Sequence, residues 1–591
     1  MPQGRRKVAF SGKQKKSQIL AKRDRKQERR ETCDETDGSV SLSNTLVHSN
    51  FESGDDLRLN SLRHLSANRD VNRYALQFRK ESNDELKRKK EEARLPLPPV
   101  DPEKCEVESE DIFVLPHLAL PKRQFWTSNM SKNELDLKEQ RYFREYVSTL
   151  ERECENVGEL GYFELNLETW RQLWRVLEMS DIILVIADIR HPIFHFPPGL
   201  YDYVVHELKK QIILVLNKVD LVPASLVLAW IEYMKNKFPK LYVTPFASYS
   251  GMKFKKSGKH RGKRIGKLRM ASKSAEGLLT ICEEIVGHNV DLSSWRHKIE
   301  DELKEEEEGS TDSDEEEFHP LKTGRQKLEK VDLSYYEGQR YKDGVLTIGC
   351  VGHPNVGKSS LLNAIMGKKV VSVSRTPGHT KHFQTIFLTK TVKLCDCPGL
   401  VFPSIAPKAL QVLMGCFPIA QLREPYSAIA FIAERINILN ILKIKHPQDE
   451  QSEWSAHDIC EAWALKRGFL TAKTGRADVY RAANHILRMA LDGRTICLAF
   501  HPPKYLKDLL SVWTKHPDSR RIEYLQCQSA FDALDSDQYF DSFDEDVESH
   551  EKLVPPNDEA DGVEADEEDT SDSDVAVAAV SNKFAVLDTS D

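Results

Sequence analysis

Short apolar runs rich in β-branched residues recur through the middle of the chain, separated by longer segments with helical spacing. Runs of this length and composition are typical of strands that are buried on both faces of a parallel sheet. Each gap except the last is long enough for a crossover helix, so the pattern predicts an α/β fold with three layers. The expected strands are residues 182–188, 212–217, 242–247, 345–352, 384–389 and 392–396.

Helical patterns precede and follow these runs. Two tryptophans and two leucines between positions 170 and 177 recur at the spacing of one helix face, which predicts a helix packed on the core. Beyond position 405 the pattern is helical throughout. Residues 455–468 begin with a capping box and end at a glycine, and residues 476–493 also end at a glycine. We therefore expect a small all-α domain after the sheet.

Charge is strongly segregated along the chain. The 591 residues include 85 Lys and Arg against 92 Asp and Glu, a formal net charge of −7. Residues 1–30 and 253–273 each carry +10, whereas residues 301–317 carry −10 and residues 531–591 carry −19. Blocks of like charge repel themselves and bury little apolar surface, so we expect these four to be disordered interaction segments.

The charged blocks also indicate location and partners. The first is expected to be a nuclear or nucleolar address that also binds RNA phosphates, with shuttling to the cytoplasm, or alternatively a solvated tail. We expect the acidic tail to recruit protein partners, and serines embedded in acidic residues to be kinase substrates. No apolar run approaches the ~18 residues of a membrane span, and the basic N-terminus lacks an apolar core. A membrane protein and a secreted protein are therefore not expected, and the 11 scattered cysteines suit a reducing compartment.

These patterns divide the chain into five expected parts. They are a basic disordered region with some helix (1–95), an N-terminal extension (96–165), the α/β domain (166–405, with a charged insertion at about 251–340), a helical domain (406–505) and an acidic disordered tail (506–591).

A phosphate-binding motif follows the fourth expected strand. Residues Gly352–Ser359 read GHPNVGKS, which fits the P-loop pattern between a strand and a helix. Its glycines let successive backbone N–H groups point at phosphate oxygens, and the helix N-terminus adds its positive dipole end. We expect Lys358 to reach the β- and γ-phosphates and the Ser359 hydroxyl to bind Mg²⁺. The expected phosphate-binding residues are Gly352, Asn355, Val356, Gly357, Lys358, Ser359 and Ser360.

A second motif distinguishes guanine from adenine. NKVD (Asn217–Asp220) stands at the end of the second expected strand. The carboxylate of Asp220 can accept both the ring N–H and the exocyclic amine of guanine, whereas adenine would leave it unpaired. We expect Asn217 to tie this loop to the P-loop and the stem of Lys218 to cover the base. GTP is therefore the expected nucleotide, and an ATPase is disfavoured because it leaves Asp220 without a role.

A third motif supplies contacts for Mg²⁺ and the γ-phosphate. DCPGL (Asp396–Leu400) follows the last expected strand, so Asp396 is expected to hold Mg²⁺ through water and the Gly399 N–H to bond the γ-phosphate. Upstream, Thr380 is the candidate that completes the Mg²⁺ shell while a γ-phosphate is present. Thr376 competes for this role, but its position before Pro377 better suits a turn.

The motifs occur in an unusual order, because Asn217 precedes the P-loop by 135 positions, whereas a Ras-like chain ends with this motif. With DIRHP at 188–192 and SRTPGHTKHFQT at 374–385, residues 160–500 resemble the circularly permuted GTPases of the YlqF/YawG-like group. The resemblance implies a permuted P-loop fold, GTP or GDP with Mg²⁺, and a role in ribosome assembly. It also implies a guanine-capping loop, for which Ala247 and Ser248 are the candidates.

Hydrolysis is expected to be slow. Leu400 stands where Ras-like enzymes carry the glutamine that orients water, and leucine cannot hydrogen-bond water. In related loops an asparagine equivalent to Asn355 helps to hold K⁺ near the phosphates, although Asn355 can equally well serve only a tight turn. The expected catalytic residues are Lys358, Thr380, Gly399 and Asn355.

Two functions therefore compete. The first is a slow GTPase switch, monomeric, that docks on a pre-ribosomal particle or rRNA through its basic segments. The second is a GTP-binding scaffold with little hydrolysis that recruits protein partners through its charged tails. Because DCPGL directly precedes the helical domain, we also expect that domain to respond to the nucleotide state.

Overall fold

The computed structural model divides the chain into two units, Met1–Arg69 and Asp70–Asp591, and every described residue lies in the second. The expectations for the first basic block fall outside the described residues. The structure describes residues 76–79, 81–113, 120–126, 130–154, 159–248, 261–307, 340–374, 377–378, 380, 383–449, 451–471, 475–509 and 511–526.

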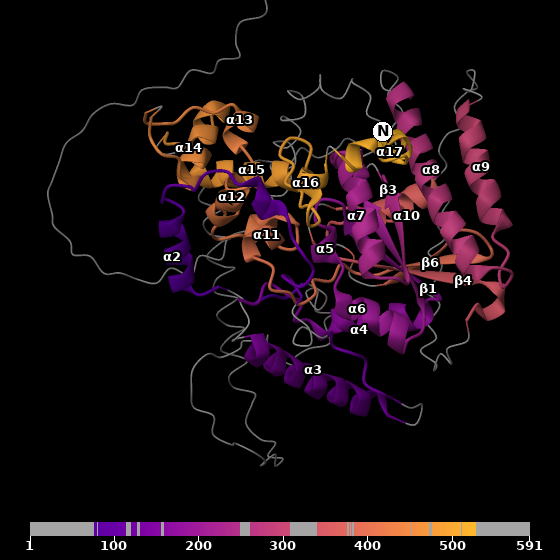
Figure 1. The fold of residues 1–591 in the computed structure, drawn as a ribbon. Helices are drawn as coiled ribbons and strands as arrows, with labels where there is room; N and C mark the ends of the chain where they lie inside the picture. The colour runs from indigo at the N-terminus through magenta and orange to yellow at the C-terminus, as the bar shows by residue number, and fades with distance from the viewer. Residues whose placement is uncertain are drawn as a thin grey trace, which may run out of the picture. The chain divides into compact units, whose positions relative to one another are not determined.

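The described strands form a six-stranded sheet in the order β3-β2-β1-β4-β6-β5. Figure 1 shows this sheet among the helices that surround it. Neighbouring strands run parallel except β5, which pairs antiparallel with β6 at the sheet edge. Every residue of β1 and β4 is buried, as the uninterrupted apolar runs predict. The strands are β1 (Ile182–Asp188), β2 (Gln211–Asn217), β3 (Leu241–Phe246), β4 (Leu346–Val351), β5 (Gln384–Phe387) and β6 (Val392–Asp396).

Helices cover both faces of the sheet. Alternate residues of β1 enter two different cores: Ile183 and Val185 pack with α4 and α7, and Ile182 and Leu184 pack with α8, α9 and α10. This alternation is the period of a strand buried on both sides, and the expected three-layer α/β fold is confirmed. The helices on the sheet are α4 (Leu167–Met179), α7 (Ala224–Lys237), α8 (Arg261–Val286), α9 (Ser293–Glu307) and α10 (Lys358–Met366), with the short α5 (Pro192–His195), α6 (Pro198–Asp202), η2 (Tyr203–Glu207), η3 (Val219–Leu221) and η5 (Lys342–Gly344).

The expectation of disorder for the blocks at 253–273 and 301–317 was wrong for their described residues. These belong to α8 and α9, which pack against each other and on the sheet. Five buried residues of α8 recur at helical spacing, namely Ala275, Leu278, Leu279, Cys282 and Val286. The described part of the basic block, residues 261–273, forms the beginning of α8, and the apolar stripe follows it along the same helix.

The helical region continues one of the two cores. Its helices share the cluster that covers the α4 and α7 face of the sheet, so no break in the core separates it from the α/β domain. The helices are α11 (Lys408–Leu413), η6 (Ile419–Gln421), α12 (Tyr426–Ala433), α13 (Ile438–Leu442), α14 (Ala456–Arg467) and α15 (Val479–Asp492). The expected capping box of Ser455 and Asp458 begins α14, and Gly468 and Gly493 end α14 and α15 in the left-handed conformation.

The folded chain also extends beyond both of its expected limits. At the N-terminal side, α2 (Asn83–Glu92) packs on α12, so the described part of residues 1–95 is ordered. At the C-terminal side, the disorder expected from residue 506 was wrong for the described residues 506–509 and 511–526, because α17 (Ser519–Gln526) packs on α7. The remaining elements are η1 (Pro102–Cys105), α3 (Lys132–Cys154), α16 (Tyr505–Asp508) and η7 (Trp513–Lys515). Among the described helices, none is long and apolar enough to cross a membrane.

Candidate functional site

The three predicted motifs meet at one edge of the sheet. The strands β1, β2, β3, β4 and β6 run parallel, so their carboxyl ends lie on the same side. Asp188 and Asn217 are register partners at the ends of β1 and β2, and Asn217 is also paired with Phe246 at the end of β3. Parallel strand ends of an α/β sheet are the usual location of a ligand crevice.

The P-loop, residues 352–359, joins β4 to α10. Gly357 caps the helix with φ +100°, a left-handed conformation that glycine adopts without strain. A Cβ at Gly357 would overlap the side-chain amide nitrogen of Asn217, so the glycine also permits close approach of the two loops. The N-terminus of α10 opens directly from this turn, which leaves its first N–H groups available to an anion.

Lys358 is buried at the base of the P-loop. Its Nζ donates to the carbonyl oxygens of Gly352 at 3.0 Å and His353 at 2.6 Å. Burial lowers the pKa of this ammonium, although the carboxylate of Asp396 opposes the shift. Gly399 approaches the same place, because a Cβ there would lie 3.2 Å from Lys358 Nζ and 2.8 Å from Pro354 Cα. The DCPGL segment and the P-loop are therefore in direct contact.

The loop of residues 217–222, termed the NKVD loop, packs against the P-loop. Asn217 is fully buried, and its Nδ2 donates to the Val356 carbonyl at 2.8 Å. Lys218 adopts a left-handed φ of +62°, and its Nζ donates to Asp188 Oδ2 at 2.7 Å and to the Asn355 carbonyl at 2.8 Å. Asp220 lies half-buried on η3, the single turn that follows.

Ser248 lies beside this junction. It is buried, and its hydroxyl is 3.7 Å from the position that a Cβ would take at Gly357. Ala247 is also buried, and its backbone N–H donates to Ser274 Oγ on α8 at 3.4 Å. The structure thus brings the segment after β3 to the same edge as the P-loop and the NKVD loop.

The residues expected to bind magnesium are only partly brought together. Asp396 is fully buried, its Oδ1 has no hydrogen-bond partner among the described residues, and Gln384 Nε2 is 3.5 Å from its Oδ2. Burial raises its pKa, against the charge of Lys358 and hydrogen bonds from Gln384 and Ser359. A buried carboxylate with an unsatisfied oxygen beside a serine hydroxyl fits a hard cation such as Mg²⁺. Thr380 is half-buried, but residue 379 and residues 381–382 lie outside the described part, so its role stays a prediction.

Leu400 faces the core rather than the edge at which the three motifs meet. Its side chain is almost fully buried, and its backbone N–H donates to the Gly352 carbonyl at 3.2 Å. This position therefore presents backbone to the P-loop and offers no side-chain group to hold a water molecule.

Asn355 links the P-loop to the helical region. It adopts φ +58°, and its Nδ2 donates to the Gly415 carbonyl, just after α11, at 2.9 Å. The positive φ agrees with the turn role considered from the sequence, and the bond to Gly415 was not foreseen. Binding of K⁺ by Asn355 stays a prediction.

An ion-pair network that the motif analysis missed lies behind this edge. The carboxylate of Asp188 accepts from Arg190 at 3.0 Å and 2.8 Å and from Lys218. Burial opposes ionisation of Asp188, but the charges of Arg190 and Lys218 outweigh it and hold its pKa well below the ordinary value. The guanidinium of Arg190 also donates to the carbonyls of Ala490 at 2.8 Å and Leu491 at 3.1 Å on α15.

Three buried histidines lie together at the P-loop, and one of them, His353, belongs to the loop itself. The rings of His195 and His353 are 4.9 Å apart, and those of His191 and His195 are 6.1 Å apart. Burial is the main cause that lowers all three pKa values, that of His191 to about 3, so the rings are neutral near pH 7. We assign them to packing rather than to proton transfer.

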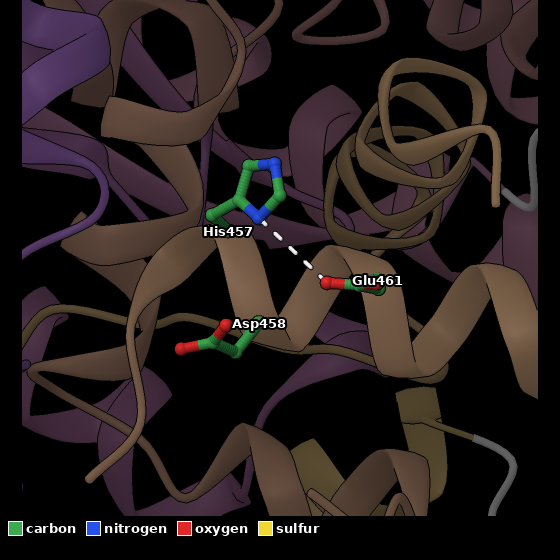
Figure 2. Close-up of side chains that lie close together, drawn as sticks. All are labelled: His457, Asp458 and Glu461. Atoms are coloured by element: carbon green, nitrogen blue, oxygen red, sulfur yellow. Dashed lines mark ion pairs between the residues drawn. The ribbon is translucent and has the colours of Figure 1, made fainter. Parts of the chain in front are cut away.

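A separate cluster on α14 has the residue types of a metal site. His457, Asp458 and Glu461 lie close together, and His457 Nδ1 is 4.0 Å from a carboxylate oxygen of Glu461 (Figure 2). Asp458 also makes capping contacts. Its Oδ2 accepts from the backbone N–H of Ser455 at 3.0 Å and from the Ser455 hydroxyl at 2.6 Å. Asp458 is thus used in capping α14, and His457 and Glu461 form a pair one helical turn apart.

Known proteins resemble the chain over most of its length. Residues 347–454 match the family model described as "50S ribosome-binding GTPase". "Guanine nucleotide-binding protein-like 1" of Pongo abelii and of Homo sapiens are 44% and 43% identical over 551 residues, covering 88% of this chain and 89% of each relative. "Large subunit GTPase 1 homolog" of Bos taurus is 34% identical over 444 residues, 65% of this chain and 67% of that protein.

A solved structure also matches part of the chain. GNP-bound YlqF from T. maritima covers 57% of this chain and 99% of its own, at 19% identity and a TM-score of 0.32. The family expected from the motifs is confirmed by the curated relatives. The chain belongs to the guanine nucleotide-binding protein-like 1 family.

Proposed function

We propose that the chain binds GTP and GDP with Mg²⁺, hydrolyses GTP slowly, and acts as a nucleotide-dependent switch. The observation that carries this proposal is the contact between loops far apart in the sequence. Asn217 donates to the P-loop carbonyl of Val356, and Gly399 lies against Lys358. Such an edge supplies backbone donors and an ammonium for phosphates, and places Asp220 on the adjoining loop to read the base.

Each residue has a distinct role in this proposal. The N–H groups of the P-loop and Lys358 bind phosphate oxygens, and Ser359 and Asp396 hold Mg²⁺, with Thr380 joining them while a γ-phosphate is present. Bound Mg²⁺ neutralises phosphate charge and orients the γ-phosphate. Asp220 accepts from guanine, Lys218 covers the base, and Ala247 and Ser248 cap it. The Gly399 N–H senses the γ-phosphate.

Slow hydrolysis follows from the surroundings of the γ-phosphate. Leu400 is buried and offers no group to orient water. A partner protein or K⁺ near Asn355 therefore supplies the missing electrostatic stabilisation. If neither a partner protein nor K⁺ does so, the chain acts instead as a GTP-binding scaffold. The buried Leu400 is the observation that favours this alternative function.

The proposed process is ribosome assembly or another assembly of RNA with protein. Support comes from the descriptions of the matched family model and of the bovine relative, which name the ribosome and its large subunit. The basic block at residues 1–30 would contact rRNA or a pre-ribosomal particle in the nucleus or nucleolus, and the acidic tail would recruit proteins. We propose that the chain works as a monomer.

A particle-association assay tests this function. Full-length wild type and Lys358→Ala would be captured from nuclear extract with or without ribonuclease treatment, in the presence of GTP or GDP. The switch predicts ribonuclease-sensitive association that differs between GTP and GDP in the wild type only. Association that is unchanged by ribonuclease, by the bound nucleotide and by the substitution would contradict the switch and favour the scaffold.

A further inference from the structure

The last described helix packs on the NKVD loop. Ile522 and Leu525 of α17 are buried, and the helix contacts α7, α8 and η3. Gln526 is the final residue of α17 and only 4% exposed. Its Nε2 donates to the carbonyls of Val219 at 3.0 Å and Val222 at 2.8 Å. A segment assigned by composition to a disordered tail therefore reaches across about 300 positions into the candidate site.

The two carbonyls that accept from Gln526 flank the residue expected to read guanine. Val219 precedes Asp220 on η3, and Val222 follows that turn. The turn is closed by the Leu221 N–H, which donates to the Lys218 carbonyl at 3.0 Å. The two amide hydrogens of Gln526 are thus directed at both ends of one short turn, and that turn carries Asp220.

Further contacts from the same end of the chain support the turn. Cys497 Sγ lies 3.4 Å from the Leu221 carbonyl, and a Cβ at Gly493 would lie 3.1 Å from Leu221 Cδ1. The carbonyls of Val219, Leu221 and Val222, on both sides of Asp220, are therefore in contact with residues that follow α15. Because buried carbonyls are costly to leave unpaired, the turn cannot rotate without losing these hydrogen bonds.

We infer that Gln526 is a positioning residue that fixes Asp220 for guanine recognition, so that α17 is part of the nucleotide site. This inference rests on the proposed GTP binding. Two bonds to one carboxylate demand a defined orientation, because the ring N–H and the exocyclic amine of guanine lie side by side. A small rotation of η3 keeps one of these bonds and breaks the other. Gln526 sets this orientation through the backbone, without touching the nucleotide.

The substitution Gln526→Met removes both hydrogen bonds and keeps the length of the side chain. The Kd values of GTP and inosine triphosphate would be measured for the full-length wild type and variant. Inosine lacks the exocyclic amine, so the ratio of the two Kd values reports the second bond to Asp220. We expect the preference for GTP to fall about tenfold in the variant, through a loss of GTP affinity.

Gln411→Met is the matched control. Gln411 is a buried glutamine that also bonds the backbone twice, since its Oε1 accepts from the Tyr162 N–H at 2.6 Å and its Nε2 donates to the Tyr162 carbonyl at 2.9 Å. Its substitution lowers stability in the same way but leaves the NKVD loop untouched. We expect the control to keep the wild-type preference for GTP over inosine triphosphate.

A second measurement uses the wild type and needs no variant. Hydrogen exchange with and without GDP should show added protection in residues 519–526, although no part of α17 belongs to the predicted contacts with the nucleotide. A folded Gln526→Met protein with an unchanged GTP preference would overturn the inference and leave GTP binding standing. So would GDP binding without added protection in α17. A wild type that binds neither nucleotide would overturn the proposed function and the inference with it.

Discussion

Substitution of Arg190 should strongly lower the stability of the protein. It tests how the α/β domain is joined to the helical region, because Arg190 follows β1 and bonds α15. Its side chain is only 1% exposed and makes four hydrogen bonds, two to Asp188 and two to carbonyls at the end of α15. In Arg190→Met the apolar stem remains, but the carboxylate of Asp188 loses two donors and each of the two carbonyls loses one. Lys218, at 2.7 Å from Asp188, offsets only part of this loss.

The expected magnitude follows from the buried pair. Breaking a buried ion pair by removing one partner costs about 3–5 kcal/mol. We expect the substitution to lower the free energy of unfolding by an amount within this range, as measured by urea denaturation at pH 7 with Trp fluorescence. Arg190→Lys keeps the charge but cannot bond both carboxylate oxygens and both carbonyls, so it should recover less than half of the loss.

Two comparisons make the result decisive. Arg171 of α4 pairs with Glu139 and Glu168 and is less completely buried than Arg190, with 11% of its side chain exposed against 1%, so Arg171→Met should cost less than Arg190→Met. In a double-mutant cycle, Asp188→Asn should reduce the effect of Arg190→Met by at least about 1 kcal/mol, because the two side chains act as a unit. A loss below about 1 kcal/mol for Arg190→Met, or full additivity with Asp188→Asn, would refute the reasoning.

Four further predictions follow from the same structure. Gly357→Ala should lower stability by about 1–3 kcal/mol in urea denaturation, because its Cβ overlaps Asn217 in a strained backbone; a wild-type midpoint would contradict this. In competition binding, Asp220→Asn should bind xanthosine triphosphate more tightly than GTP, the reverse of the wild type. An unchanged preference for GTP would show that Asp220 does not take part in base recognition. Burial raises the pKa of Glu164 to about 8 from 4.5, against backbone N–H donors such as Gln77. The native state therefore holds this proton more tightly, so the free energy of unfolding should fall as pH rises from about 4.5 to about 8 and Glu164→Gln should flatten that fall; parallel curves would contradict it. GTP turnover should be faster in KCl than in NaCl at equal ionic strength, and equal rates would reject a K⁺ role for Asn355.

The edge at which the three motifs meet was predictable because its signals are local. A P-loop between a strand and a helix, NKVD after a strand, and DCPGL after another need only a parallel sheet to bring them together. Apolar runs such as β1 predicted that sheet. The contact between Asn217 and Val356 follows from this logic, although the residues are 139 positions apart.

The limits of the fold were less predictable, because composition averages over whole segments. The net charge of residues 253–273 concealed the start of α8, whose apolar stripe appears only when positions are taken three and four apart. In the same way, a boundary at residue 506 merged a short folded helix with the acidic tail. Ile522 and Gln526 are buried by α7 and the NKVD loop, and no local sequence pattern predicts that α17 packs there.

The hydrogen bonds that link the site to distant parts of the chain were not predictable from a single sequence. Arg190 lies in a short polar motif whose partners on α15 are about 300 positions away. An arginine flanked by isoleucine and histidine gives no sign of its burial, because arginine is usually exposed. The bond from Asn355 to Gly415 is hidden for the same reason, since an asparagine in a loop is adequately explained by its turn.

Nucleotide competition tests the central claim most directly. A fluorescent GDP analogue would be titrated onto the full-length protein with Mg²⁺ and then displaced by GTP, GDP or ATP, with Lys358→Ala as the variant that lacks the phosphate-binding ammonium. The account predicts that GTP and GDP displace the analogue, that ATP does not, and that Lys358→Ala binds at least about tenfold more weakly. Displacement by ATP as readily as by GTP, or no binding of the analogue by the wild type, would contradict it.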